Sequence, residues 1–196
     1  GVGGYISAPA VLGAWTLGLG RAIHEANVVP GMANKLCARV AQQILLTYER
    51  TKDRMPGQAP CHVVGVPVNP AVLESDPAQA FERYQLAPDR PVALFVGGSL
   101  GAAKLNELAI AAAKVPARNY QILHISGPRY YEEVRLELGE VSDHCLKDYE
   151  NRMGDAYAVA SLVVCRAGSS TLAELAAVGR ASLLIPSPNV TENHQE

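Results

Sequence analysis

The chain has 196 residues, of which 48% are hydrophobic and 18% are charged, and its formal net charge is −2. This composition is typical of a globular protein. The near-neutral charge, without clustered Lys and Arg, excludes an electrostatic footprint for nucleic acid or for anionic lipid. The four cysteines, Cys37, Cys61, Cys145 and Cys165, form no C-x-x-C pair, which favours reduced thiols in a cytoplasmic protein over a metal or redox motif.

The first third of the chain predicts strand and helix in alternation. A glycine-rich turn at residues 1–5 opens the sequence with no strand before it, so we expect an upstream piece to be missing. Helices are expected at residues 8–17 and 33–42, and strands at 22–25, 44–48 and 62–66. Pro67 and Pro70 disfavour helix in the residues before them and mark a domain boundary near Pro67. A charged stretch at residues 74–90 is expected to be irregular.

Alternation continues to the end of the chain. Strands are expected at residues 92–96, 121–126, 162–165 and 182–185, and helices at 102–113, 129–138, 153–161 and 170–178. The strands are mostly continuous apolar runs, as in a parallel sheet buried on both faces. The pattern therefore predicts an α/β fold with two Rossmann-like, doubly wound domains, residues 1–67 and 68–196, both incomplete.

A glycine-rich turn at residues 97–102 joins a buried strand to a helix. Free N–H groups at a helix N-terminus suit a phosphate, glycines let the backbone approach it, and Ser99 adds a hydroxyl. The spacing is neither G-x-G-x-x-G nor a Walker loop. Phosphate binding and a purely structural turn remain about equally good interpretations.

A second strand–turn–helix junction runs from Cys165 to Leu175. Thr171 and Glu174 form a capping-box pattern, which would give Glu174 a structural role. The Glu174 carboxylate can instead accept hydrogen bonds from two ribose hydroxyls; from the residues alone the cap is the better interpretation. Both junctions belong at the carboxyl edge of one sheet, where open α/β sheets bind ligands.

Two turns of the first domain carry further polar side chains. His24, Glu25 and Asn27 follow a strand, where a lone histidine is more often structural than catalytic. Ser7 either caps the first helix or joins an anion site.

These segments together resemble the MurG family of glycosyltransferases, family 28. The likeness covers nearly the whole chain, and several segments recur in the right order. These are Gly3-Gly4-Tyr5-Ile6-Ser7, His24-Glu25-x-Asn27, Gly65-x-Pro67-Val68, Gly97-Gly98-Ser99-x-Gly101-Ala102 with Asn106, Ser126-Gly127, Cys165-Arg166-x-Gly168 with Glu174, and Asn193-His194-Gln195.

The resemblance implies a GT-B fold and transfer of N-acetylglucosamine from UDP-N-acetylglucosamine to undecaprenyl-linked muramyl-pentapeptide, with inversion and without a metal or cofactor. It implies that Gly98, Ser99 and Gly101 hold the diphosphate, and that Glu174 holds the ribose. The backbone near Tyr149 and Glu150 would meet uracil. The sugar would contact Asn27, Gly168, Ser169, Ser170, Thr171 and Gln195.

The resemblance also implies a peripheral protein on the cytoplasmic face of the membrane, attached through an N-terminal domain whose leading part lies upstream. The sequence departs from the family at Ala26, where Gln is usual, and at Asn69, where Arg is usual. The proposed base belongs to an upstream loop, so the catalytic set is incomplete and the isolated chain is expected to be inactive. Alternatives are a non-catalytic UDP-sugar-binding subunit and a GT-B UDP-sugar epimerase.

Overall fold

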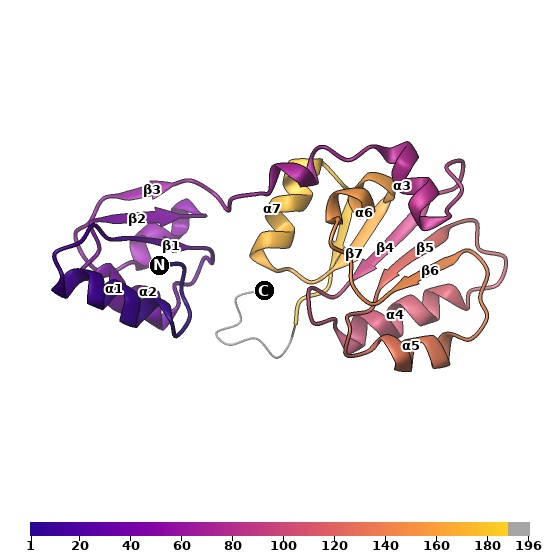
Figure 1. The fold of residues 1–196 in the computed structure, drawn as a ribbon, viewed down its shortest axis with the longest axis horizontal. Helices are drawn as coiled ribbons and strands as arrows, with labels where there is room; N and C mark the ends of the chain where they lie inside the picture. The colour runs from indigo at the N-terminus through magenta and orange to yellow at the C-terminus, as the bar shows by residue number, and fades with distance from the viewer. Residues whose placement is uncertain (188–196) are drawn as a thin grey trace. The chain divides into compact units, whose positions relative to one another are not determined.

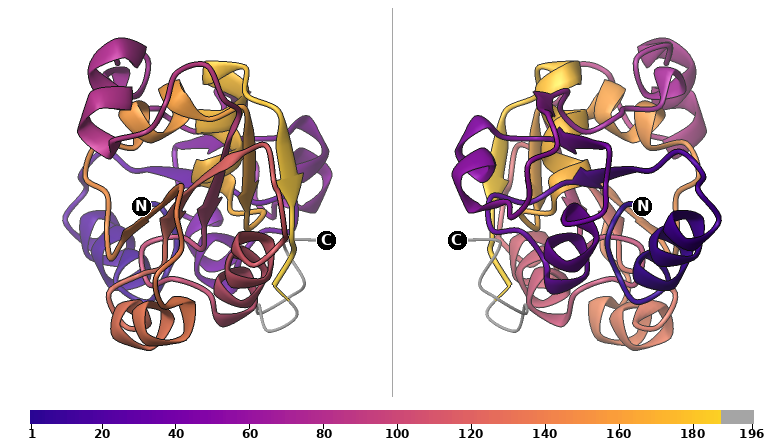
Figure 2. Two further views of the ribbon diagram at one scale, coloured as in Figure 1. Left: turned by 90° about the vertical axis from the view of Figure 1, so that its right-hand side faces the viewer. Right: turned by 90° about the vertical axis from the view of Figure 1, so that its left-hand side faces the viewer.

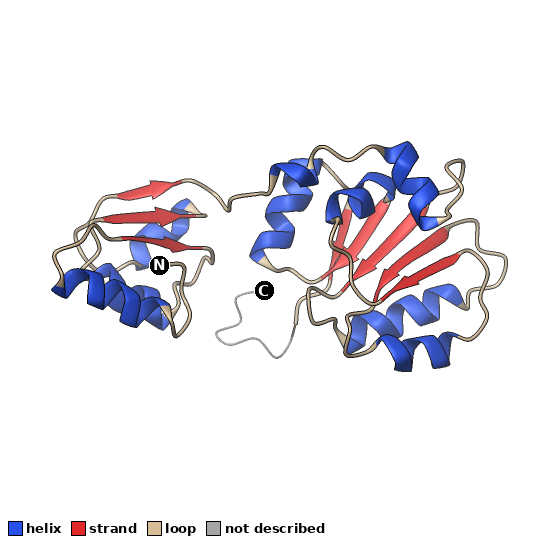
Figure 3. Cartoon of the chain, in the orientation of Figure 1, coloured by secondary structure: helices blue, strands red, loops and turns tan. Residues whose placement is uncertain are grey.

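Every β-strand within residues 1–187, the part of the chain that the computed structural model describes, lies in one of two parallel sheets (Figure 3). The chain divides into two units, Gly1–Pro67 and a second unit that begins at Val68 (Figure 1). Each unit contains one sheet and its own hydrophobic core.

The first unit has a three-stranded sheet in the order β1-β2-β3, formed by Ala22–Glu25, Gln43–Leu46 and Cys61–Val63. Helices α1 (Ser7–Thr16) and α2 (Met32–Ala38) supply Val11 and Cys37 to a core with Ile23 and Ile44 of the strands. A 3-10 helix, η1 (Glu49–Arg54), follows β2. The short strands bury aliphatic side chains against both helices, which holds this unit together.

The second unit has a five-stranded parallel sheet in the order β6-β5-β4-β7-β8. The strands are β4 (Val92–Val96), β5 (Gln121–Ile125), β6 (His144–Lys147), β7 (Leu162–Cys165) and β8 (Ser182–Leu184). The chain winds outward from β4 through β5 to β6, then returns to β7 on the other side of β4. This is the doubly wound order, and the direction of winding reverses between β4 and β7.

Helices cover both faces of this second sheet (Figures 2 and 3). One layer is formed by α4 (Ala103–Ala113) and α5 (Tyr131–Leu138), which pack on Phe95 and Ile122. The other layer is formed by α3 (Pro77–Tyr84), α6 (Met153–Val159) and α7 (Ser169–Val178), joined by the 3-10 helix η2 (Pro70–Val72). The prediction of an α/β fold with parallel sheets is confirmed.

Several elements differ from the sequence expectation. The helix expected at residues 33–42 ends at Ala38, the strand expected at 62–66 is Cys61–Val63, and the 3-10 helices η1 and η2 were not expected. The largest differences are α3 and β6. The stretch at residues 74–90 is not wholly irregular, because α3 occupies part of it. Asp76 caps this helix by accepting from the Ala78 N–H, Pro77 occupies its first turn, and Ala80 and Tyr84 are buried. The pattern at Asp76-Pro77 is a helix start that the charged composition obscured.

Strand β6 was also not predicted from the sequence. Its sequence, His-Cys-Leu-Lys, is short and half polar, and all four residues are only partly buried. Its place at the edge of the sheet, paired with β5 alone in the described residues, explains the weak apolar pattern.

Within residues 1–187 the structure contains no helix with the length and apolarity needed to cross a bilayer.

Candidate functional site

Two strand-to-helix turns meet where the second sheet changes its winding direction. They are the β4–α4 turn (residues 97–102) and the β7–α7 turn (residues 167–171). Strands β4 and β7 are parallel neighbours, with Val96 paired to Cys165 at their ends. Both turns therefore open on the same edge of one sheet, as predicted. Ligands of open α/β folds bind at this kind of edge, beside the switch in strand order.

The β4–α4 turn is closed by a hydrogen bond from the Gly101 N–H to the Gly98 carbonyl (3.0 Å). Gly98 and Gly101 have φ angles of +87° and +78°, which favour glycine. A Cβ at Gly101 would lie 2.1 Å from the Ser126 carbonyl oxygen. Gly98 and Ser99 are exposed. The turn is thus held from behind by the β5–α5 connection while its tip is open to a ligand.

Helix α4 starts directly after this turn. Its N-cap residue, Ala102, has no side-chain acceptor, so the N–H groups of the first turn are not satisfied by their own cap. Together with the helix dipole they form a donor set suited to an anion. The start of α4 therefore has the features of an anion-binding helix N-terminus.

The β7–α7 turn leads into α7 with Gly168 as the N-cap residue, in extended conformation. Ser169, Ser170 and Thr171 form the first turn of the helix. The capping-box interpretation of Thr171 and Glu174 is wrong, because a capping box needs the hydroxyl at the N-cap. Thr171 is the third helical residue, so Glu174 lies too far along the helix to close the box.

Glu174 instead contacts a neighbouring helix. The Tyr157 hydroxyl of α6 donates to Oε2 of Glu174 (2.8 Å). Tyr157 is 1% exposed, whereas Glu174 is half-buried and lines an open pocket. The carboxylate of Glu174 therefore forms part of the wall of this pocket instead of capping its helix.

That pocket has a volume of about 410 Å³ and lies within the second unit. It brings together Tyr149, Glu150 and Glu174, three of the residues implicated by the family resemblance. The other lining residues come from η2 and its flanks and from the start of α6: Asn69, Ala71, Val72, Glu74, Ser75, Asn151, Arg152, Met153 and Gly154. Gly98, Ser99, Gly101 and residues 168–171 do not line it; they lie at the ends of β4 and β7.

Glu150 has a structural role in the wall of the pocket. It is 7% exposed and accepts from the Tyr84 hydroxyl (3.0 Å), the Arg152 N–H (2.8 Å) and Lys147 Nζ (3.1 Å). Burial favours a raised pKa for Glu150, but the Arg152, Lys147 and Tyr84 contacts outweigh it and lower that pKa. The Glu150 carboxylate is therefore engaged by protein donors. A ligand could meet the backbone of this segment and the exposed Tyr149 side chain instead.

Asn27 belongs to the first unit, in a loop organised by a buried carboxylate. Glu25 is 2% exposed and accepts from the N–H groups of Asn27 and Gly31 (both 3.0 Å) and from Asn34 Nδ2 (2.9 Å). His24 Nε2 lies 2.8 Å from the Gly65 carbonyl oxygen, in agreement with a structural histidine. Gln195 lies outside the described residues.

Ser7 does not cap α1, whose N-cap residue is Ile6. Its hydroxyl accepts from the Val2 N–H (3.0 Å) and donates to the Gly3 carbonyl (2.7 Å). The helix begins at Ser7 itself, so the Ser7 side chain does not cap it. It stabilises the N-terminal glycine turn instead.

Sequence reasoning missed Tyr157 and Tyr84, the two phenols that hold the pocket carboxylates. Both lie on apolar helix faces and have the pattern of core residues. A signal was nevertheless present, because a buried tyrosine hydroxyl needs a hydrogen-bond partner.

Comparison with known proteins places this geometry in a family. Residues 92–196 match the glycosyltransferase family 28 C-terminal domain, and residues 1–46 match the family 28 N-terminal domain. UDP-N-acetylglucosamine–N-acetylmuramyl-(pentapeptide) pyrophosphoryl-undecaprenol N-acetylglucosamine transferases are similar over the full chain. The protein from Desulforamulus reducens is 37% identical and the one from Bacillus subtilis is 34% identical. The chain spans 55% of the length of each of these two curated relatives.

Solved structures agree. The crystal structure of Acinetobacter baumannii MurG has a TM-score of 0.69 at 30% identity, over 100% of this chain and 54% of that one. Anabaena HepE, solved with UDP and glucose, has a TM-score of 0.60 at 13% identity over 90% of this chain and 55% of that one, a likeness of fold alone. A family match over more than half the chain, with the switch-point turns in place, shows that this protein is a MurG-like member of glycosyltransferase family 28.

Proposed function

We propose that the second unit, residues 68–196, binds UDP-N-acetylglucosamine and that the whole protein transfers N-acetylglucosamine to undecaprenyl-linked muramyl-pentapeptide. One observation carries this proposal. The β4–α4 and β7–α7 turns lie side by side where the winding of the sheet reverses, and the same unit has a pocket that Glu174 lines. Family membership and the activity for which the longer relatives are named support the choice of donor and acceptor. Residues 1–67 then belong to the acceptor domain.

Each part of the site receives one part of the donor. The β4–α4 turn and the α4 N-terminus hold the diphosphate, with Ser99 as a side-chain donor and Gly98 and Gly101 as the close backbone. Glu174 accepts from the ribose hydroxyls, and the backbone at Tyr149 and Glu150 meets the uracil in the 410 Å³ pocket. Residues 168–171 contact the sugar.

The reaction is a single displacement with inversion at the anomeric carbon. The acceptor hydroxyl oxygen forms a bond to that carbon, its proton passes to a base, and the bond to the UDP oxygen breaks. Negative charge develops on the departing diphosphate, where the preorganised N–H groups at the start of α4 stabilise it. We assign the base to no residue among 1–187.

The first unit supports an association with the cytoplasmic membrane face that holds such a lipid acceptor. Near the end of α1, Trp15, Leu17 and Leu19 have exposed fractions of 53%, 74% and 55%. Exposed apolar and aromatic side chains of this kind favour a bilayer interface. Binding to vesicles, reduced by Trp15→Ser together with Leu17→Ser, would test this part of the proposal.

The ribose contact is tested by Glu174→Gln, with UDP affinity measured by calorimetry. Gln keeps the size of the side chain but replaces a charged acceptor with a neutral amide. Hydrogen bonds to charged groups contribute about 1.5–3 kcal/mol, so affinity should fall roughly ten- to a hundredfold. 2′-Deoxy-UDP should bind the original protein more weakly than UDP, and lose little further affinity in the variant.

Glu107→Gln is the matched control. Glu107 is an exposed carboxylate of α4 that pairs with Lys104 (2.8 Å), outside the pocket, so its removal should leave UDP affinity unchanged. Equal affinities of the original protein and Glu174→Gln for UDP would show that Glu174 does not bind the ribose.

A further inference from the structure

Tyr157 is a buried polar group to which the proposed chemistry gives no role. It lies in the middle of α6, 1% exposed, and its hydroxyl reaches Oε2 of Glu174 on α7 at 2.8 Å. The two residues are seventeen positions apart and come from different helices. This contact joins the pocket wall to the core behind it.

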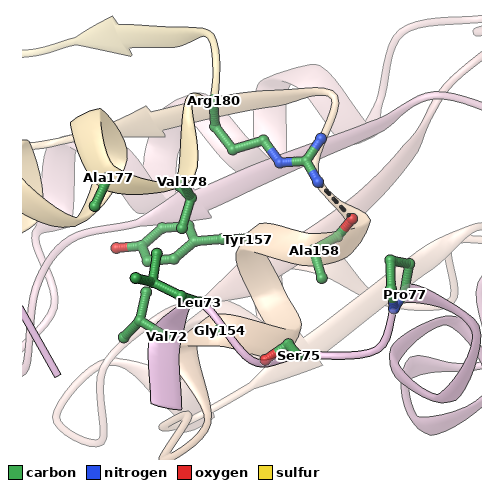
Figure 4. Close-up of a pocket in the computed structure, with 10 residues that line it drawn as sticks. All are labelled: Val72, Leu73, Ser75, Pro77, Gly154, Tyr157, Ala158, Ala177, Val178 and Arg180. Atoms are coloured by element: carbon green, nitrogen blue, oxygen red, sulfur yellow. Dashed lines mark hydrogen bonds between the residues drawn. The ribbon is translucent and has the colours of Figure 1, made fainter. Parts of the chain in front are cut away.

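Packing holds the Tyr157 ring in one place. Figure 4 shows the ring beside Val72 and Leu73 of the η2 segment and Val178 of α7, with its hydroxyl directed away from Arg180. These residues line a cavity of about 250 Å³. Arg180 donates to the Ala158 carbonyl (3.0 Å) and so ties the end of α7 to α6. The donor is therefore fixed relative to the helix that carries Glu174.

The Tyr157 hydroxyl is a permanent donor. Burial raises its pKa far above the usual range, and the hydrogen bond to the Glu174 carboxylate raises it further. The Glu174 side chain, by contrast, is half-buried and lines an open pocket. A fixed donor on one carboxylate oxygen limits the rotamers of Glu174 and leaves the second oxygen for another partner.

The second tyrosine–carboxylate pair of this pocket shows the difference. Glu150 accepts from Tyr84, from Lys147 and from the Arg152 N–H, and it is almost fully buried. Among the described residues, Glu174 accepts a side-chain hydrogen bond from Tyr157 alone, and it stays half-exposed. Protein donors thus use most of the hydrogen-bonding capacity of Glu150, whereas Glu174 has one such donor and keeps capacity for a further partner.

We propose that Tyr157 is the positioning residue for ribose recognition: its hydroxyl holds Oε2 of Glu174 so that the carboxylate meets the ribose hydroxyls in a preset orientation. This inference rests on the proposed function, since it assigns Glu174 to the ribose. It adds a residue that touches no substrate and acts through another side chain.

The test compares UDP with 2′,3′-dideoxy-UDP as ligands of the full chain, by calorimetry. Tyr157→Phe removes the hydroxyl and keeps the ring. UDP affinity should fall roughly three- to tenfold, the effect of losing one hydrogen bond. Affinity for 2′,3′-dideoxy-UDP should stay unchanged, because that ligand has no ribose hydroxyl for Glu174 to accept. In Glu174→Gln, adding Tyr157→Phe should cause little further loss of UDP affinity.

Two other tyrosines serve as controls. Tyr120→Phe removes a hydroxyl that donates to the Ala112 carbonyl (3.0 Å), away from the pocket, and should leave both affinities unchanged. Tyr84→Phe loosens Glu150 and should weaken both ligands by the same factor. Binding of 2′,3′-dideoxy-UDP also reports that each variant is folded.

The outcomes separate this inference from the proposed function. Suppose that Glu174→Gln lowers the affinity for UDP but not for 2′,3′-dideoxy-UDP. If Tyr157→Phe then lowers the affinity for both ligands by the same factor, or changes neither affinity, Tyr157 has only a structural role and the inference is overturned. If the original chain does not distinguish UDP from 2′,3′-dideoxy-UDP, the ribose role of Glu174 fails first. If Glu174→Gln and Tyr157→Phe each lower the affinity for UDP alone, and the double variant loses little more than Glu174→Gln, both the ribose contact of Glu174 and the positioning role of Tyr157 are supported.

Discussion

At the scale of single residues, the site depends on positions where the backbone itself is the functional group. Gly101 brings the β4–α4 turn against the Ser126 carbonyl, and a Cβ there would lie 2.1 Å from that oxygen. Gly98 has a similar positive φ, but a Cβ added to it would meet nothing within 4 Å. One glycine is thus required by both conformation and space, and the other by conformation alone.

Gly101→Ala should therefore destabilise the second unit more than Gly98→Ala. A positive φ costs a non-glycine residue about 1–2 kcal/mol, and forcing atoms into a packed site adds about 1–3 kcal/mol. Only Gly101→Ala incurs both costs, because its neighbour is backbone and cannot rotate away. Urea unfolding of the two variants measures the difference, and equal losses of stability would contradict the close packing of this turn.

At the scale of elements, the pocket is built where the start of α6 rests on the η2 segment. A Cβ on Gly154 would lie 2.8 Å from the Ala71 carbonyl oxygen, 2.9 Å from that of Val72 and 2.4 Å from Ser75 Oγ. The helix can approach the segment this closely because Gly154 has no side chain. The contact sets the position of Met153 and Arg152, which line the pocket.

Gly154→Ala should lower the stability of the second unit and weaken UDP binding, although alanine is the better helix former. Displacing α6 from two backbone carbonyls should cost about 1–3 kcal/mol. Gly13→Ala is the matched substitution, since Gly13 lies inside α1 with nothing within 4 Å of its Cβ position. It should stabilise its unit by about 0.5–1 kcal/mol. Thermal unfolding distinguishes the two, and a gain in both would refute the packing argument.

At the scale of the whole molecule, the described chain is two units with separate cores, and the second one contains a buried imidazole, His124, beside a partly buried one, His144. His124 is 1% exposed, and its ring lies 5.5 Å from that of His144 in the neighbouring strand. Burial lowers the pKa of His124 to about 3, with a further contribution from His144. Burial, together with the charge of Arg118, lowers the pKa of His144 to about 4.

These shifts predict that the second unit loses stability in mild acid. Well above pH 6.5 both histidines are neutral in the folded and unfolded states and contribute no pH dependence. As the pH falls from about 6.5 towards 4, the unfolded chain takes up protons that the folded chain does not, so stability declines. Each such proton corresponds to a slope of about 1.4 kcal/mol per pH unit.

His144→Leu should flatten this dependence by up to one proton. Both ring nitrogens of His144 lack a hydrogen-bond partner within the described residues, so leucine removes the titrating group without breaking a hydrogen bond. Unfolding free energies measured between pH 4 and 7 give the slope. An unchanged slope in the variant would show that His144 titrates alike in the folded and unfolded chains.

Much of the second unit could be predicted from its sequence because its central strands, β4 and β7, are continuous apolar runs followed by a turn that contains glycine. The run at residues 92–96 is strand β4, and the glycines after it form the expected turn into α4. The same holds for β7 and α7. The helix α3 and the strand β6 could not be found in this way, because charged or polar residues dilute their periodicity. Packing of α3 against α6 and pairing of β6 with β5 help to hold them in place.

The sequence by itself determined the alternation of strand and helix, the two glycine turns and the family, because these depend on local residue patterns and their order. Tertiary structure alone decided what Glu174 does. Its spacing from Thr171 predicted a cap, but α7 begins at Ser169, with Gly168 as its N-cap, and the carboxylate meets the Tyr157 hydroxyl instead. A helix start depends on backbone conformation at one residue, and a contact between two helices depends on how both pack on the sheet. Neither is encoded in the spacing of two residues along the chain.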